Sequence, residues 1–319
     1  MHENNTMEKA LVTGGAGFIG SNIAKKLVEE GVEVVVLDSL YLGDESNLSN
    51  IEEDIEFIKG SVLDRETVEE AVEGCDTVFH QAARSSSPMH KDDAAEGARV
   101  NIEGFVNTIE ASKEAGSVEK IVYASTSSMY GSVEPPHEED NGEYPTNLYT
   151  ASKMARELYA TVYSQQTDMH FTGLRYFSVY GPHERAKGDY ANVVTQFMWK
   201  MMDGDRPVIW GDGDQSRDFT FVEDIARANY MAAERKDETN GEYYNIGTGR
   251  DVDFNTLVEK LNEALGTDIE PEHIEHPRDN PVMATKADYS RAKLQLGYEP
   301  QYSFEEGLKK TVEYYRNHL

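Results

Sequence analysis

The sequence predicts an α/β protein with a doubly wound parallel (Rossmann) sheet and a smaller C-terminal α/β lobe. Short apolar runs alternate with helical patterns over the first 180 residues, and this alternation loosens afterwards. Strands that alternate with helices form parallel sheets, because each crossover helix packs on a face of the sheet. We therefore expect a first domain over residues 7–180 and a lobe over residues 181–319 that interleaves with it.

The expected strands are apolar runs that end before glycine or polar residues, as in parallel sheets with both faces covered. Those of the first domain cover 10–12, 33–37, 55–60, 77–80, 120–125 and 170–176. Helices are expected where apolar residues recur at a spacing near 3.6, over 21–28, 67–72, 94–115 and 147–165. The second half has helical patterns over 222–234, 254–265 and 304–317, and some of its strands are expected to join the main sheet.

A glycine-rich segment, TGGAGFIG over residues 13–20, connects the first strand to the first helix. A strand, a glycine-rich turn and a helix N-terminus together bind the pyrophosphate of a dinucleotide. Gly14 permits the tight turn, Gly17 lets the pyrophosphate approach the backbone, and Gly20 lets helix and strand pack closely. The alternative, that these glycines only break a loop, is disfavoured by the strand and helix on either side.

The second strand ends at Asp38, close to the distance at which dinucleotide folds bind the adenosine ribose. An acidic side chain binds a free 2′-hydroxyl and repels a 2′-phosphate. The next residues, 39–41, contain no arginine that would reverse this preference. We therefore expect NAD rather than NADP as the cofactor, and no metal.

Composition excludes several classes of protein. The chain has 319 residues, 59 acidic and 30 basic, with a net charge of −29, so clustered basic side chains for nucleic acid are not expected. Hydrophobic residues make up 39% of the chain, which disfavours disorder. No apolar stretch is long enough to span a membrane, and the first residues lack the apolar middle of a secretory signal. With a single cysteine, Cys75, these features predict a cytoplasmic protein.

The negative charge predicts that stability depends on salt. Self-repulsion destabilises a compact acidic protein, and dissolved salt screens it, with a Debye length of about 3 Å at 1 M. We expect an acidic surface suited to a salty cytoplasm, and a melting temperature that is higher in molar salt than in dilute buffer. Circular dichroism melts in both buffers measure this, and equal melting temperatures would contradict it.

Three residues form a candidate catalytic group. Tyr149 and Lys153 are four residues apart on an expected helix and therefore share a face, and Thr126 follows the fifth strand. An ammonium beside a phenol lowers the phenol pKa from about 10, so such a tyrosine can act as a general base. The alternative is a surface helix with an incidental tyrosine and lysine, but the dinucleotide turn upstream favours catalysis.

The chain resembles the extended short-chain dehydrogenase/reductase family, and within it the nucleotide-sugar epimerases, from Glu8 onward. The resemblance rests on the glycine turn, on the candidate catalytic group and on four further segments. These segments are HQAA at 80–83, LRYF at 174–177, YGP at 180–182 and RDFTFV at 217–222.

The resemblance implies roles for two sets of residues. The NAD site would comprise Gly14, Gly17, Phe18, Ile19, Gly20, Asp38, Ser61, Val62, Ala82, Ala83, Asn101, Tyr149, Lys153 and Phe177. The sugar nucleotide would be held by Ser86, Thr126, Ser178, Asn192, Arg217, Arg278 and Thr285, with the two arginines on its pyrophosphate. The arginines could equally be surface ion-pair partners. Ser61 replaces an aspartate that usually binds the adenine, and Ser178 replaces a common asparagine.

The reaction can be narrowed within the family. Related dehydratases and decarboxylases carry a glutamate soon after the active threonine, whereas this chain has Ser127 and Ser128. The resemblance therefore implies epimerisation at C4 of a UDP-linked hexose through a transient 4-keto sugar. Thr285, where relatives that exclude N-acetylated sugars have tyrosine, leaves room for UDP-N-acetylglucosamine.

Three alternatives stay open. The segment 180–188 also resembles an ADP-heptose 6-epimerase, and a dehydrogenase that releases NADH is a further enzyme of the same type. A non-catalytic NAD-sensing regulator is a different class, disfavoured because it need not keep the tyrosine and lysine. By analogy with relatives, the helices over 94–115 and 147–165 would form a homodimer interface.

Overall fold

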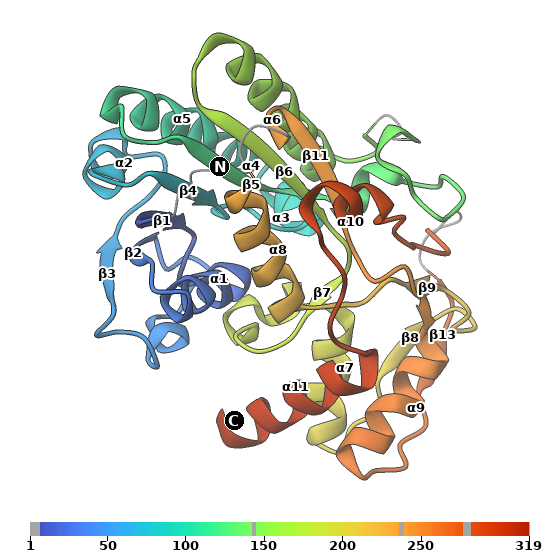
Figure 1. Ribbon diagram of the computed structural model, residues 1–319. Coiled ribbons are helices and arrows are strands. Elements are labelled where there is room, and N and C mark those ends of the chain that lie inside the picture. The colour runs from blue at the N-terminus through green and yellow to red at the C-terminus, as the bar shows by residue number, and fades with distance from the viewer. Residues whose placement is uncertain (1–6, 142–144, 236–238, 277–281, 319) are drawn as a thin grey trace.

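A seven-stranded parallel sheet crosses the centre of the protein, within the residues that the computed structural model describes, 7–141, 145–235, 239–276 and 282–318 (Figure 1). The strands lie in the order β11-β6-β5-β4-β1-β2-β3. They are β1 (Lys9–Thr13), β2 (Glu33–Asp38), β3 (Ile55–Lys59), β4 (Thr77–His80), β5 (Lys120–Thr126), β6 (His170–Tyr176) and β11 (Glu242–Ile246). The order reverses at β1, which pairs with β2 on one side and β4 on the other, and ligands bind at such switch points.

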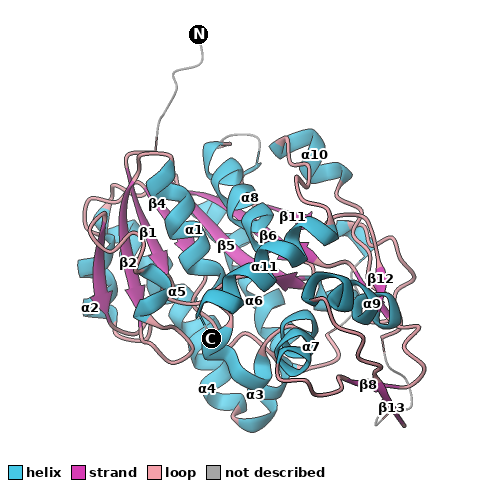
Figure 2. Cartoon of the chain, turned by 90° about the horizontal axis from the view of Figure 1, so that it is seen from below, coloured by secondary structure: helices cyan, strands magenta, loops and turns pink. Residues whose placement is uncertain are grey.

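Helices cover both faces of the sheet, as the alternating pattern predicted (Figures 1 and 2). One face carries α1 (Phe18–Glu29), α8 (Val222–Glu234) and α10 (Ser290–Leu296), whose apolar residues share one core with β1 and β2. The other face carries α2 (Arg65–Val72), α5 (Gly104–Ala115) and α6 (Leu148–Gln166). Because both faces are covered, the inner strands are buried along most of their length.

The helix expected over 94–115 is interrupted. It consists of α4 (Ala94–Ala98), a π-helical turn (Arg99–Glu103) and α5. Single π-turns of this kind occur frequently at functional sites. The short helix α3 (Ser87–Asp92), with Pro88 in its first turn, was not predicted.

The second half forms a lobe that begins directly after β6. Its helices α7 (Val193–Met202), α9 (Phe254–Leu265) and α11 (Phe304–His318) enclose a separate core that includes Phe197, Leu257 and Leu308. Three strand pairs join it: β7 (Val179–Tyr180) with β10 (Thr220–Phe221), β8 (Val208–Trp210) with β13 (Glu272–Ile274), and β9 (Ser216–Arg217) with β12 (Val252–Asp253). Short 3-10 turns cover Glu45–Leu48, Ser127–Tyr130, Glu139–Asn141 and Arg185–Tyr190.

Parts of the second half return to the sheet. Strand β11 pairs with β6 in parallel register, Tyr244 opposite Leu174, and α8 and α10 pack on the same face as α1. The predicted fold class is therefore confirmed. No helix among the described residues is long and apolar enough to cross a membrane.

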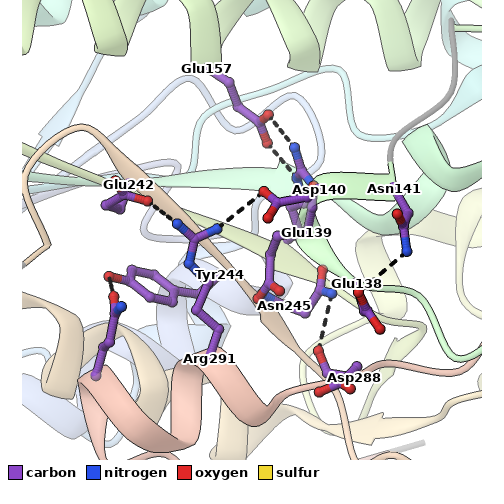
Figure 3. A network of polar contacts seen from close by, with 12 residues as sticks. Glu138, Glu139, Asp140, Asn141, Glu157, Glu242, Tyr244, Asn245, Asp288 and Arg291 are labelled. Atoms are coloured by element: carbon purple, nitrogen blue, oxygen red, sulfur yellow. Dashed lines mark hydrogen bonds and ion pairs between the residues drawn. The ribbon is translucent and has the colours of Figure 1, made fainter.

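A buried polar network joins the two halves, and Figure 3 shows its two ends, Glu157 and Asn245, among neighbouring polar contacts. Glu157 on α6 accepts two hydrogen bonds from the guanidinium of Arg175, Nε to Oε1 at 2.9 Å and Nη2 to Oε2 at 2.8 Å. Arg175 Nη1 also donates to the Tyr130 hydroxyl, which donates to Asn245 Oδ1 on β11 at 2.6 Å. A bidentate pair between an arginine and a carboxylate both stabilises the fold and fixes the relative orientation of the two side chains. The network therefore aligns α6, β6 and β11.

Candidate active site

A cavity of about 750 Å³ lies at the carboxyl ends of the sheet strands. Residues after β1, β2, β3, β4, β5 and β6 line it, together with the first turns of α1 and α6. Its position is the switch point between β1 and β4, where doubly wound sheets bind dinucleotides.

The glycine turn has the geometry of a phosphate-binding loop. Gly14 has φ +69°, its amide donates to Leu37 O at 2.7 Å, and a Cβ there would lie 2.8 Å from the Ala82 amide nitrogen. A Cβ on Gly20 would collide with the carbonyl of Gly14, so α1 can pack this closely only with glycine there. Gly17 lines the cavity, and a Cβ on it would meet only Gly14 O, at 3.2 Å. These features fit the pyrophosphate of a dinucleotide.

Asp38 is fixed at the cavity wall. Its carboxylate accepts hydrogen bonds from the amides of Ala16 at 3.0 Å and Leu40 at 2.7 Å. Burial raises the pKa of this carboxyl group, while the two backbone hydrogen bonds act in the opposite direction. The side chain is held rigidly where a ribose hydroxyl can bind it.

Most of the expected cofactor residues line this cavity. They are Gly14, Gly17, Phe18, Ile19, Gly20, Asp38, Ser61, Val62, Ala82, Ala83, Tyr149 and Lys153. Phe177 does not line it and is buried instead, with its ring packed against those of Tyr130 and His137, which stack on each other.

Asn101 also lies behind the cavity wall rather than in it. In the π-turn, its Oδ1 accepts from the amide of Arg84 at 2.8 Å, and its Nδ2 donates to Arg84 O at 3.2 Å and to Ser152 Oγ at 2.9 Å. It therefore fixes the backbone of Arg84. Asn101 would influence the binding of a cofactor only indirectly, by positioning Arg84 in the cavity wall.

Sequence reasoning missed a contact that bridges the cavity mouth. The guanidinium of Arg84 lies 3.2 Å from the ring centroid of Tyr41 and 3.3 Å from Glu96, and all three residues line the cavity. Lys187 and Tyr190, from the lobe, also line it. Apart from Glu96 on α4, these residues come from loops or turns, and no periodic pattern in the sequence marks them.

The three candidate catalytic residues meet at the end of β5. Tyr149 lies in the first turn of α6, which Asn147 caps by accepting from the Thr150 amide at 3.0 Å. The side chain of Thr126, the last residue of β5, hydrogen-bonds the phenol. Lys153 lies four residues further along α6. Its Nζ is 5.9 Å from the Tyr149 ring centroid and donates a hydrogen bond to Ala124 O at 3.1 Å.

The electrostatics of this group differ from the sequence-based expectation. Burial dominates and raises the pKa of Tyr149, although the hydrogen bond with Thr126 and the charge of Arg156 lower it. Burial also lowers the pKa of Lys153 well below its usual range, and the like charge of Arg156 adds to this. The expected lowering of the phenol pKa by Lys153 is therefore not found, because both groups are withdrawn from water.

The expected substrate residues fall into two groups. Ser86, Thr126, Ser178 and Asn192 line the cavity, and the buried Ser86 hydroxyl has no hydrogen-bond partner among the described residues.

Arg217 and Thr285 do not line the cavity. Arg217 on β9 donates to the carbonyls of Ser216 and Val282, at 2.7 and 3.1 Å. Thr285 accepts from the Asp218 amide at 3.4 Å. Arg278 lies outside the described residues. No group of side chains that could bind a metal ion occurs in the described part of the chain.

Comparison with known proteins supports an NAD site in this cavity. The profile of the NAD dependent epimerase/dehydratase family matches residues 10–247. The chain belongs to this family. The UDP-glucose 4-epimerase of Mycolicibacterium smegmatis is 35% identical over 314 residues, covering 97% of this chain and 99% of the relative. The resemblance to extended short-chain dehydrogenases/reductases is thereby confirmed.

Solved structures of family members have the same fold. UDP-glucose 4-epimerase from Thermotoga maritima, solved with UDP-glucose, has a TM-score of 0.90 and 38% identity over 97% of this chain and 99% of that one. The Thermus thermophilus enzyme, solved with NAD, has a TM-score of 0.85 and 32% identity over 98% of this chain and 100% of that one. The cofactor of this family is NAD, and the glycine turn and Asp38 fit it.

The family also contains other reactions. A UDP-N-acetyl-alpha-D-glucosaminuronate decarboxylase of Bacillus cytotoxicus is 31% identical over 324 residues, covering 97% of this chain and 98% of the relative. Membership alone therefore shows an NAD-dependent enzyme of the epimerase/dehydratase type and leaves its reaction to the residues of the site.

The position of Asp38 predicts cofactor preference. In Asp38→Ser the carboxylate expected to bind the ribose is lost, so the Kd for NAD should rise about tenfold, the cost of a charge-assisted hydrogen bond. NADP should be excluded less strongly, because a negative charge is removed. Calorimetric titration with both dinucleotides measures this.

Asp44→Ser is the matched control for that variant. Asp44 caps the nearby 3-10 turn by accepting from Ser46 N at 2.9 Å, and it does not line the cavity. This control should bind NAD normally. An unchanged NAD affinity in Asp38→Ser, with NADP still excluded, would contradict the assignment.

Proposed function

We propose that the protein epimerises C4 of a UDP-linked hexose, with Tyr149 as the general base. The observation that carries this proposal is the convergence of Tyr149, Thr126 and Lys153 in one cavity with the dinucleotide turn. Residues 7–180 would bind NAD and carry the catalytic group, and residues 181–319 would mostly bind the sugar nucleotide.

In the proposed mechanism, Tyr149 takes the proton of the sugar 4-hydroxyl and later returns it. Thr126 hydrogen-bonds the same hydroxyl and aligns it with the phenol. NAD supplies the acceptor and donor for the C4 hydride. The 4-keto sugar turns over in the cavity while its nucleotide stays anchored, so that hydride returns to the opposite face.

The side chains beside Thr126 support epimerisation over elimination. Among the described residues that line the cavity, the acidic ones are Asp38 and Glu96, and both belong to its cofactor half. Ser127 and Ser128 provide only hydroxyl groups next to Thr126. A dehydratase or decarboxylase needs an acid there, whereas a redox step without elimination does not.

We further propose UDP-glucose and UDP-galactose as substrates, with the N-acetylhexosamine pair accepted as well. Support comes from the UDP-glucose 4-epimerases among the relatives and from a UDP-N-acetylglucosamine 4-epimerase of Methanobrevibacter ruminantium with a TM-score of 0.91. ADP-heptose is the competing substrate, since Lys187 in the segment 180–188 lines the cavity.

Tyr149→Phe should reduce epimerisation of UDP-galactose at least a thousandfold while NAD stays bound, because the variant lacks the group that accepts the proton. A coupled assay for UDP-glucose measures turnover. Tyr163→Phe, on the same helix but bonded to Glu110 at 2.7 Å, is the control and should be fully active. Substantial turnover by Tyr149→Phe would contradict the role of this residue.

The same assay separates the alternatives. Offered UDP-galactose, UDP-N-acetylglucosamine and ADP-heptose, the wild-type enzyme should convert the UDP-sugars without net NADH formation. Accumulation of NADH would indicate a dehydrogenase, turnover of ADP-heptose alone a heptose epimerase, and NAD binding without any turnover a regulator.

We also propose that the protein forms a homodimer through the outer face of α6. This face exposes Leu158, Tyr159 and Val162 by 68%, 44% and 49%, and Tyr163 connects it to Glu110 on α5. Three large apolar side chains at neighbouring helical positions form a patch of the kind that another surface covers. A second copy would bury it by pairing α5 and α6 across a two-fold axis.

Leu158→Asp should convert the dimer to a monomer, because it places a charge in the buried centre of the interface. Sedimentation velocity measures the change. Leu294→Asp, at an 84% exposed leucine on α10, is the control and should remain dimeric. A monomeric wild-type protein, or a dimer that survives Leu158→Asp, would contradict this interface.

A further inference from the structure

Arg156 is a fully buried arginine for which the proposed chemistry has no role. It follows Tyr149 by seven residues and Lys153 by three, so the three side chains lie along one face of α6. Helical side chains tilt toward the N-terminus of their helix. The guanidinium of Arg156 therefore extends toward Lys153 and Tyr149.

The hydrogen bonds of Arg156 end on backbone carbonyls. Its Nε donates to Asn101 O at 2.6 Å and its Nη2 to Ala82 O at 2.8 Å, and its guanidinium carbon lies 5.6 Å from the Phe105 ring centroid. Nη1 has no hydrogen-bond partner, and no carboxylate pairs with this side chain, among the described residues. A buried charge without a counter-ion is costly, so a group that benefits from it is expected nearby.

The other buried arginine of this region, Arg175, does have a carboxylate partner. Arg175 is also buried, but Glu157 neutralises it through two hydrogen bonds. Glu157 directly follows Arg156 on α6, yet it is committed to Arg175 and to the hydroxyl of Ser125 at 2.5 Å. The charge of Arg156 is thus left to act on the groups around it.

The titratable groups around Arg156 come from four elements: His80 on β4, His90 on α3, Tyr123 on β5, and Tyr149 and Lys153 on α6. Burial lowers the pKa of both histidines, and the charge of Arg156 contributes, so they are neutral at pH 7. The pKa of Tyr123 is raised well above its usual range by burial.

Arg156 keeps its charge in this environment. Burial lowers its pKa to about 10, whereas the pKa of Lys153 falls well below its usual range. At neutral pH, Arg156 is therefore protonated and contributes a buried positive charge to this cluster.

We propose that Arg156 is a positioning residue that supplies a permanent positive charge close to Tyr149. The hydrogen bond from its guanidinium to the carbonyl of Ala82 fixes this charge at the wall of the cofactor cavity. Its charge stabilises the phenolate form of Tyr149, a role that the sequence assigned to Lys153 alone. This inference rests on the proposed function of Tyr149 as the general base.

Two variants separate charge from structure. Arg156→Gln keeps a hydrogen-bond donor and removes the charge, whereas Arg156→Lys keeps an amine whose protonation is opposed by burial beside Lys153. In Arg156→Gln, the pH at which kcat for UDP-galactose is half-maximal should rise by at least one unit, with little change in KM or bound NAD. Turnover at pH 7 should fall about tenfold, and Arg156→Lys should restore only part of it.

A second readout does not depend on turnover. The phenolate absorbance of Tyr149, taken as the difference spectrum between each holoprotein and its Tyr149→Phe derivative, should titrate at higher pH in Arg156→Gln than in wild type. If Tyr149→Phe kept its epimerase activity, the proposed function would fail, whereas this titration would still decide whether Arg156 acts on the phenol.

Lys120→Met is the matched control. Lys120 is also a fully buried cation, donating to Arg235 O at 2.8 Å and Thr239 Oγ1 at 2.7 Å, but it lies at the opposite end of β5. Its loss should lower the melting temperature and leave the pH profile unchanged. If Arg156→Gln behaved in the same way, with a lower melting temperature but wild-type pH profile and phenolate titration, Arg156 would be a structural clamp and the proposal would be wrong.

Discussion

The burial of one polar face of α6 against the carboxyl end of β5 is the constraint on which the site depends. This face presents Tyr149 and Lys153 to the cavity and buries Lys153 and Arg156 beneath it. Burial there penalises every charged form, which is why the pKa of the phenol rises and that of the lysine falls. A proton acceptor in such a place depends on positive charge held nearby, and the fold supplies the guanidinium of Arg156, which no carboxylate in the described part of the chain pairs with.

The position of α6 is in turn set by the buried network that runs from Glu157 to Asn245. Glu157 links the helix to Arg175 on β6, and the contacts continue through Tyr130 to Asn245 on β11. Strand β11 comes from the second half of the chain, so α6 is aligned by both halves together. The return of the chain to the sheet therefore completes the support of the site.

Much of the fold could be predicted because strands buried on both faces appear as continuous apolar runs. Helix α7 was missed, since its sequence VVTQFMWKMM is apolar on most sides and begins with β-branched valines. The glycine turn and Asp38 were predictable because their spacing is local. Arg84 and Tyr41 were not, because their contact joins two loops. The orientation of Asn101 depends on a π-turn that no periodicity reveals.

The central claim is that one carbinol carbon is oxidised and then reduced in place by a cofactor that never leaves. Incubation with UDP-galactose deuterated at C4 tests this most directly. The account predicts UDP-glucose that retains deuterium at C4, with a slower rate than for unlabelled substrate and no free NADH. Loss of the label to solvent, or a product that is not the C4 epimer, would contradict it.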